Sequence, residues 1–115
     1  KMALLNNQKN ILPLSSISEL LNTKTRTLKM YEEKLLLPLE KDKTIKKLYS
    51  IDDIKIIAFV HYLATIKKIN SNGILYILEI IEDNMDLKHK QEFLKIIEKK
   101  LETLSSSDSE KLDNF

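Results

Sequence analysis

The sequence contains no cysteine and no tryptophan, and only one glycine and two prolines among its 115 residues. The lack of cysteine excludes disulfides, thiolate metal sites and cysteine nucleophiles. So few glycines and prolines cannot supply the many turns of an all-β chain, which favours helices. The sequence also lacks a run of about 18 apolar residues and a signal-peptide pattern, so we expect a cytoplasmic protein that does not enter a membrane.

What is present is a dense and unevenly distributed set of charges. The length and a charged fraction of 31% fit one globular domain with a modest core. The net charge is only +2, yet residues 24–47 hold eight basic against four acidic side chains, whereas residues 48–115 hold nine against twelve. Such asymmetry is common on a solvated surface, but it is also typical of nucleic-acid binding. The motifs have to decide between the two.

A first short helix is predicted after an arm at residues 1–12, which has no clear hydrophobic period. The stretch "SSISELLN" offers Ser15 or Ser16 as the N-cap, with Glu19 as the reciprocal partner of a capping box. The apolar residues of this stretch fall on one edge of a helix that ends near Asn22.

A second short helix follows after a polar turn. Thr23 or Thr25 can cap it, and in "KTRTLKMYEE" and the residues after it Leu28, Tyr31 and Leu35 share one face. Two short helices joined by a tight turn form a helix-turn-helix, whose second helix can enter the major groove of DNA. The spacing leaves the basic side chains of this second helix on the remaining circumference.

Two further helices and a hairpin are predicted beyond Pro38, which ends the second helix. The stretch "LEKDKTIKKLYS" has turn-forming residues in its middle and predicts a short hairpin. Ser50 and Asp53 form a capping box before "IDDIKIIAFVHYLATIKK", which is apolar on most sides and is expected at the centre of the core. Asn70 or Ser71 caps a fourth helix. The apolar positions of that helix are Ile74, Ile77, Leu78 and Ile81.

The remaining sequence predicts a domain at residues 13–84, a helix at 85–104 and a disordered tail at 105–115. The helix carries an apolar stripe with a partly heptad spacing, which is typical of helices that pair two subunits. The stripe consists of Leu87, Leu94, Ile97, Leu101 and Leu104. Lys90 interrupts it, and the alternative is that the helix folds back on its own domain.

Two blocks of the sequence, "RTLKMYEEKLLLP" and "KKLYSIDDI", resemble the DNA-binding domain of the MerR family of bacterial transcription regulators. The resemblance covers roughly residues 14–82. It implies a mainly α fold: a winged helix-turn-helix domain with a short β-hairpin wing, followed by a C-terminal dimerisation helix. The tract "INSNGILYIL" is similar to the heat-shock repressor and nitrogen-regulator branches of the family.

The resemblance also implies a function and its partners. We expect a sequence-specific regulator that binds double-stranded DNA as a homodimer, through an antiparallel coiled coil, on a palindromic operator. RNA polymerase or a protein co-regulator is a further expected partner. Members that sense metals or drugs carry extra cysteines or a further domain, so we expect no metal and no cofactor here. The alternative is an architectural protein, such as a recombination directionality factor, or a protein-interaction module on the same winged scaffold.

Several positions differ from the family pattern. Lys29 stands where arginine is common, Met30 where the family often has its first tyrosine, and Leu35 where it has glycine. Ile45 and Lys46 lie near wing positions that are usually glycine and aromatic. Because a β-branched isoleucine resists positive φ, we expect the wing to turn differently.

The chain's only arginine, Arg26, lies in the first turn of the second helix. Arginine is the side chain best suited to bind guanine O6 and N7 with two hydrogen bonds, so Arg26 is the candidate base reader. The alternatives are that it binds a phosphate or pairs with Glu32 or Glu33. The other residues expected to contact DNA are Lys24, Thr25, Lys29, Met30, Lys46 and Lys47. The lysines among them are expected to bind phosphates. The alternative for Thr25 is that it only caps the helix.

Other residues of chemical interest have structural interpretations. His61 lies in an apolar helix and is expected to be packed and hydrogen-bonded rather than a metal ligand. Asp52 and Asp53 suit a helix N-terminus better than a pair of catalytic acids. By resemblance, Tyr49 anchors the wing to the core and Tyr31 packs between helices. The sequence has no phosphate loop or nucleophile-base pair, so we expect no enzyme and no catalytic residues.

Overall fold

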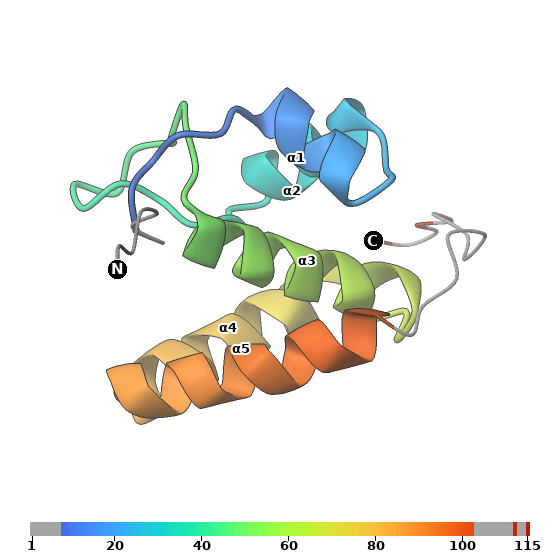
Figure 1. Ribbon diagram of the computed structural model, residues 1–115. Helices are drawn as coiled ribbons and strands as arrows, with labels where there is room; N and C mark the ends of the chain where they lie inside the picture. Colours follow the sequence, from blue (N-terminus) through green and yellow to red (C-terminus); the bar gives the residue numbers. More distant parts are fainter. Residues whose placement is uncertain (1–7, 103–111, 113–114) are drawn as a thin grey trace.

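The computed structural model describes residues 8–102, 112 and 115 of the chain. Its helices are α1 (Leu14–Leu20), α2 (Thr25–Glu33), α3 (Ile51–Thr65), α4 (Ser71–Asn84) and α5 (Leu87–Glu102). They form three layers: α1, α2 and the loop before α3 lie on one side of α3, and α4 and α5 lie on the other (Figure 1). The prediction of a mainly helical protein is confirmed. None of the described helices has the length and apolar character needed to cross a membrane.

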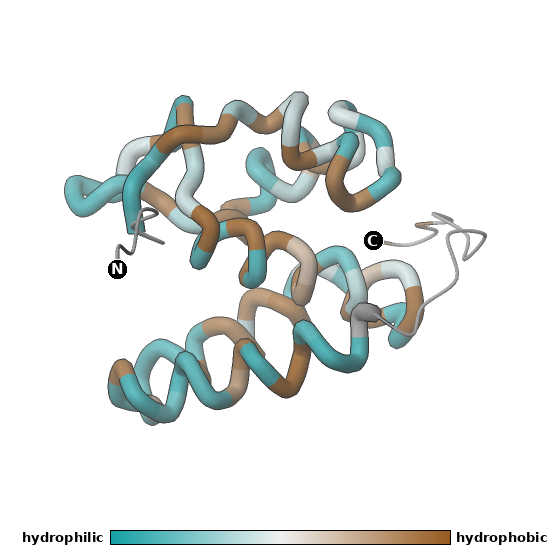
Figure 2. The backbone as a smooth tube through the Cα atoms, in the orientation of Figure 1, coloured by the Kyte–Doolittle hydropathy of each residue, from teal (hydrophilic) through white to brown (hydrophobic). Residues whose placement is uncertain are grey.

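The middle helix α3 is the centre of the core, as its sequence predicts. Its buried side chains include Ile57, Phe59, Val60 and Leu63, which belong to one continuous hydrophobic cluster. Figure 2 shows strongly hydrophobic residues along α3 and hydrophilic residues along much of α5. A helix that is apolar on most of its surface needs neighbours on both sides, and the two outer layers supply them.

The predicted caps of α3 and α4 are confirmed. The Asp53 backbone N–H donates to Ser50 Oγ at 3.1 Å, and the Ser50 N–H donates to Asp53 Oδ2 at 3.0 Å. This reciprocal pair satisfies two backbone donors at the start of the central helix. At the start of α4, the Gly73 N–H donates to Asn70 Oδ1 at 2.9 Å, so Asn70 is the cap.

The predicted starts of α1 and α2 are wrong. The N-cap of α1 is Pro13 and that of α2 is Lys24, and neither side chain makes a capping hydrogen bond. Ser16 and Glu19 are inside α1, so they cannot form the expected box. Thr25 is the first helical residue of α2 rather than a residue before it. The extended Pro13 backbone opens α1 earlier than the serines would, because a proline suits the edge of a helix.

The expected β-hairpin wing is not seen as strands. The described residues contain only two isolated antiparallel bridges in this region, between Leu39 and Ile45 and between Leu12 and Tyr49. Ile45 and Leu48 are exposed. A two-stranded hairpin is only marginally stable without an apolar face to bury, so the pairing does not extend beyond one residue pair.

The wing turns at Lys43, whose φ is 71°. The Lys43 N–H donates to the Glu40 carbonyl at 2.9 Å, and the Glu40 N–H donates to the Thr44 carbonyl at 2.9 Å. This is the pattern of a three-residue hairpin loop that ends in a left-handed residue. The positive φ therefore falls on a lysine and not on Ile45, in line with the expected change of turn.

Helix α5 packs against α3 of the same chain. Leu94 and Ile97 are only 8% and 6% exposed, and Phe93 meets Phe59 edge to face at a ring-centroid distance of 5.2 Å. Leu87, at the start of the stripe, is 63% exposed. The members of the stripe whose side chains lie outside the described part are Leu101 and Leu104. Within one subunit, α5 thus folds back on its own domain, which is the alternative that the sequence allows.

The predicted domain boundaries stay predictions. Residues 1–7 of the arm and most of the tail at 105–115 lie outside the described residues.

Candidate nucleic-acid interface

One face of α2 is buried and the other is basic. Leu28 and Tyr31 are fully buried against the rest of the chain. Lys24, Arg26 and Lys29 are exposed. This separation arises from the apolar spacing of three residues, which fixes the side on which the cations lie.

The side chain of Arg26 makes no hydrogen bond or ion pair with another residue in the part of the chain that the structure describes. Glu32 is one of the two acids with which Arg26 could have paired. It instead accepts a hydrogen bond from the Tyr49 hydroxyl at 3.2 Å. The guanidinium of Arg26 is exposed on the first turn of α2 and can reach a planar acceptor such as a guanine edge or a phosphate.

Two of the expected contact residues are turned partly inward. Thr25 Oγ1 lies 2.9 Å from Ser18 Oγ, so the two hydroxyls join α2 to α1. Ser18 also donates to the Ser15 carbonyl at 2.7 Å. Met30 is half-buried and packs against the core. Thr25 therefore joins α2 to α1 and Met30 packs against the core, and the contact of either residue with DNA stays a prediction.

The two wing lysines differ in their surroundings. Lys46 Nζ lies 2.5 Å from Asp53 Oδ2 and donates to Asn10 Oδ1 at 3.0 Å, and its side chain is only 11% exposed. This ammonium fastens the wing to the first turn of α3. Lys47 is exposed and is the wing cation that is open to a phosphate. The sequence shows Asp53 as a cap but gives no sign of its second role as the partner of Lys46.

Tyr49 joins the wing to helix α2. Its side chain is buried, and its hydroxyl donates to Glu32 of α2. Burial raises the pKa of the Tyr49 hydroxyl above its ordinary value, and the negative charge of Glu32 adds to the rise. Tyr49 therefore remains a neutral donor at physiological pH. The expected anchor role of Tyr49 is confirmed.

Tyr31 and His61 connect α2 to the central helix. The Tyr31 hydroxyl and His61 Nδ1 are 2.7 Å apart, and the two rings are tilted with a centroid distance of 5.8 Å. The prediction of a packed, hydrogen-bonded histidine is confirmed. The contact fixes the buried side of α2 against α3.

The C-terminal end of α2 closes with Leu35 in a left-handed conformation, at φ 62°. The Leu35 N–H donates to the Glu32 carbonyl and the Leu36 N–H donates to the Tyr31 carbonyl, both at 3.0 Å. These two bonds define a Schellman motif, in which glycine is the usual left-handed residue. The sequence difference at Leu35 thus changes the residue but not the shape of the helix end.

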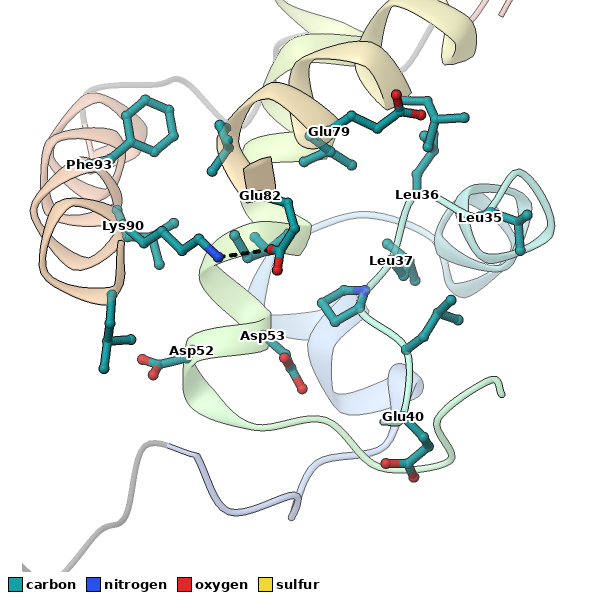
Figure 3. A pocket seen from close by; sticks show the side chains of 18 of the residues that line it. Leu35, Leu36, Leu37, Glu40, Asp52, Asp53, Glu79, Glu82, Lys90 and Phe93 are labelled. Carbon is teal, nitrogen blue, oxygen red and sulfur yellow. Dashed lines mark hydrogen bonds and ion pairs between the residues drawn. The ribbon is translucent and has the colours of Figure 1, made fainter. Parts of the chain in front are cut away.

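A groove of about 560 Å³ lies between the segment after α2 and helices α3, α4 and α5 (Figure 3). Apolar side chains such as Leu37 and Leu78 line it, together with five acids and two lysines. Lys90 Nζ donates to Glu82 Oε2 at 3.0 Å within it. The excess of acids makes the groove unsuited to bind phosphate.

Helices α1 and α2, joined by a tight turn and with cations on the open side of α2, form a helix-turn-helix of the DNA-binding class. Residues 12–79 match the model of the MerR HTH family of regulatory proteins. The chain belongs to this family and is a DNA-binding transcription regulator. Neither a curated protein nor a solved structure matches the chain.

Proposed function

We propose that the protein is a sequence-specific regulator that binds duplex DNA as a homodimer on a palindromic operator. The observation that carries the specificity is the exposed guanidinium of Arg26 in the first turn of α2, which has no partner in the described part of the chain. Arg26 reads a base edge, while Lys24, Lys29 and Lys47 neutralise phosphates on either side.

Two substitutions separate base reading from phosphate binding. Changing Arg26 to alanine should cost about 1–3 kcal/mol on the cognate site and relax the preference at one base pair per half-site. Changing Lys47 to alanine should weaken binding to all duplexes about equally. Titration of both variants with a cognate and a random duplex measures the loss of affinity for each. Equal weakening of the two duplexes by Arg26→Ala would contradict the base-reader role.

Lys46 provides a matched control, because it is the neighbour of Lys47 but is bonded to Asp53 and Asn10. Changing Lys46 to alanine should lower the thermal stability and leave the salt dependence of DNA binding almost unchanged. Changing Lys47 to alanine should reduce the slope of log K against log salt by about one, without a loss of stability. The opposite result would show that Lys46 leaves Asp53 to bind a phosphate.

The proposed dimer uses α5. Since Leu94 and Ile97 already pack in the core of their own subunit, charge placed there would unfold the protein and leave the question open. Leu87 is 63% exposed and tests the interface without this difficulty. Leu87→Glu should remain folded but shift towards monomer in light scattering, with weaker operator binding. A wild type that is monomeric at high micromolar concentration would contradict the dimer.

Selection from random duplex DNA distinguishes a specific regulator from the architectural alternative. A symmetric dimer with one recognition helix per subunit should select two-fold palindromes. Recovery of only asymmetric sites would count against the dimer, and recovery of no preferred sequence would favour an architectural role. A dimer that neutralises about six to ten phosphates should lose about 10³-fold or more in affinity between 50 and 200 mM salt. A protein-interaction module would not show this dependence of DNA affinity on salt.

A further inference from the structure

Phe115 lies against the buried side of the recognition helix. Its ring centroid is 5.5 Å from that of Tyr31, with the two planes tilted by 53°. Both Phe115 and Leu112 pack against the hydrophobic core, and the Phe115 N–H donates to the Leu112 carbonyl at 3.3 Å. Tyr31 itself has no exposed surface. Phe115 is therefore part of what covers the back of α2.

The same residue is bonded to the first residue of α4. The main-chain oxygen of Phe115 accepts a hydrogen bond from the Ser71 backbone N–H at 3.0 Å and another from Ser71 Oγ at 2.9 Å. α2 and α4 lie in the two outer layers, on opposite sides of α3 (Figure 1). Phe115 thus links one outer layer to the other at one end of the molecule.

This link matters because it adds to the contacts that join α2 to the rest of the fold. The extensive helix contacts pair α1 with α2, and α3 with α4 and α5. Hydrogen bonds from α2 side chains to the segment before α3 and to α3 include those of Glu32 with Tyr49 and of Tyr31 with His61. A ring that packs on Tyr31 therefore acts directly on one of the connections that set the angle of α2.

We propose that Phe115 is a positioning residue for DNA recognition. It does not touch DNA. It presses on Tyr31 and is held by Ser71, and in this way it keeps α2 at the angle at which Arg26 meets a base edge. The inference rests on the proposed function, because it assigns a second residue to the same act of sequence reading.

The expected size of the effect follows from the population of the correct orientation. If loss of Phe115 lets α2 hold that orientation for about a tenth to a third of the time, cognate affinity falls about threefold to tenfold. Random DNA is bound through lysine charges that tolerate a change of angle, so its affinity should stay the same. The ratio of the two affinities is the readout, because a loss of stability alone would not change it.

The first test replaces the ring. In the full chain, Phe115→Ala should reduce the ratio of cognate to random-duplex affinity about threefold to tenfold, and Phe115→Leu should restore most of it by keeping an apolar contact with Tyr31. Amide hydrogen exchange at Ser71 reports docking independently of DNA, because the main-chain oxygen of Phe115 accepts from that N–H. The Ser71 amide should exchange faster in Phe115→Ala than in the wild type.

The second test leaves Phe115 in place and removes its anchor. Ser71 is the first residue of α4, a position that tolerates proline, and Asn70 before it has the extended backbone that proline requires. Ser71→Pro removes both donors to Phe115, whereas Ser71→Ala keeps the backbone donor. The specificity ratio should fall in Ser71→Pro and hold near the wild-type value in Ser71→Ala.

The outcomes separate this inference from the proposed function. A wild type without sequence preference refutes the proposed function, and the inference with it. Folded Phe115→Ala and Ser71→Pro variants that keep the wild-type specificity ratio refute only the inference. Slow Ser71 exchange that is unchanged by Phe115→Ala would also overturn it. If Phe115→Ala fails to fold, Ser71→Pro alone decides.

Discussion

Leu35 offers a direct test of how helix α2 ends. The residue has φ 62°, and the two hydrogen bonds of the Schellman motif place it at the position after the C-cap Lys34. In the left-handed backbone conformation, the Cβ of an L-residue crowds the neighbouring carbonyl oxygen, which costs roughly 1–2 kcal/mol. Glycine has no Cβ and avoids this cost. We expect Leu35→Gly to be more stable than Leu35→Ala, the reverse of the usual order in helices.

The comparison of glycine with alanine isolates the backbone effect, since both substitutions remove the same leucine side chain. Relief of the left-handed cost favours glycine by roughly 1–2 kcal/mol, and the greater freedom of glycine in the unfolded chain takes back roughly 0.5–1 kcal/mol. The difference should be about 1 kcal/mol, or about 4 °C in melting temperature for a domain of this size. Leu35 is 58% exposed, so repacking around either variant is small.

Urea unfolding followed by circular dichroism measures both variants on one scale. Lys34 provides the matched control, because its φ is −86° and alanine should be more stable than glycine there. Equal slopes against urea would show that the denatured states are alike. If Leu35→Ala equals or exceeds Leu35→Gly in stability, the left-handed backbone does not limit the stability of this helix end.

Two further predictions concern local contacts. A Cβ at Gly73 would lie 2.7 Å from Ile69 Cγ2, so Gly73→Ala should destabilise the protein by about 1 kcal/mol in urea unfolding, despite the helix preference of alanine. In an Ile69→Leu background, which lacks that methyl group, the same change should become favourable. The Thr44 hydroxyl, which donates to Asp42 at 2.6 Å, lowers the pKa of the Asp42 carboxyl below its ordinary 3.8. This carboxylate stabilises the fold above the unfolded pKa, and the contribution is lost as the pH falls from about 4 through the folded pKa. In Thr44→Val the pKa measured by NMR titration should rise towards 3.8, and an unchanged value would contradict the assignment.

Features that depend on neighbouring residues could be predicted from the sequence. The capping box of Ser50 and Asp53 spans four residues, and the apolar spacing of α2 places Arg26 on its exposed side. The starts of α1 and α2 could not be predicted in the same way. Several hydroxyl residues there suit a cap equally well, and Ser18 and Thr25 bond to each other across the two helices.

Contacts between distant residues explain most of what the sequence did not reveal. Lys46 looks like a free wing cation in the sequence, and only the fold brings it to Asp53. Phe115 and Ser71 are 44 positions apart, and no periodic pattern points to their bond. The turn-forming residues and the family resemblance both predicted a β-hairpin wing, but the exposure of its apolar residues removes the burial that would extend the pairing.

The position of α5 limits how two subunits can pair. Leu94 and Ile97 complete the core against α3, so a coiled coil that used them would have to leave that core open in both subunits. The intramolecular contact also has the advantage of a high effective concentration, which is in the millimolar range for short connections. A dimer compatible with the folded subunit can therefore use apolar side chains that the core leaves exposed, such as Ile96 of α5 or Tyr76 of α4. One helix can then serve the core with one edge and a second subunit with another.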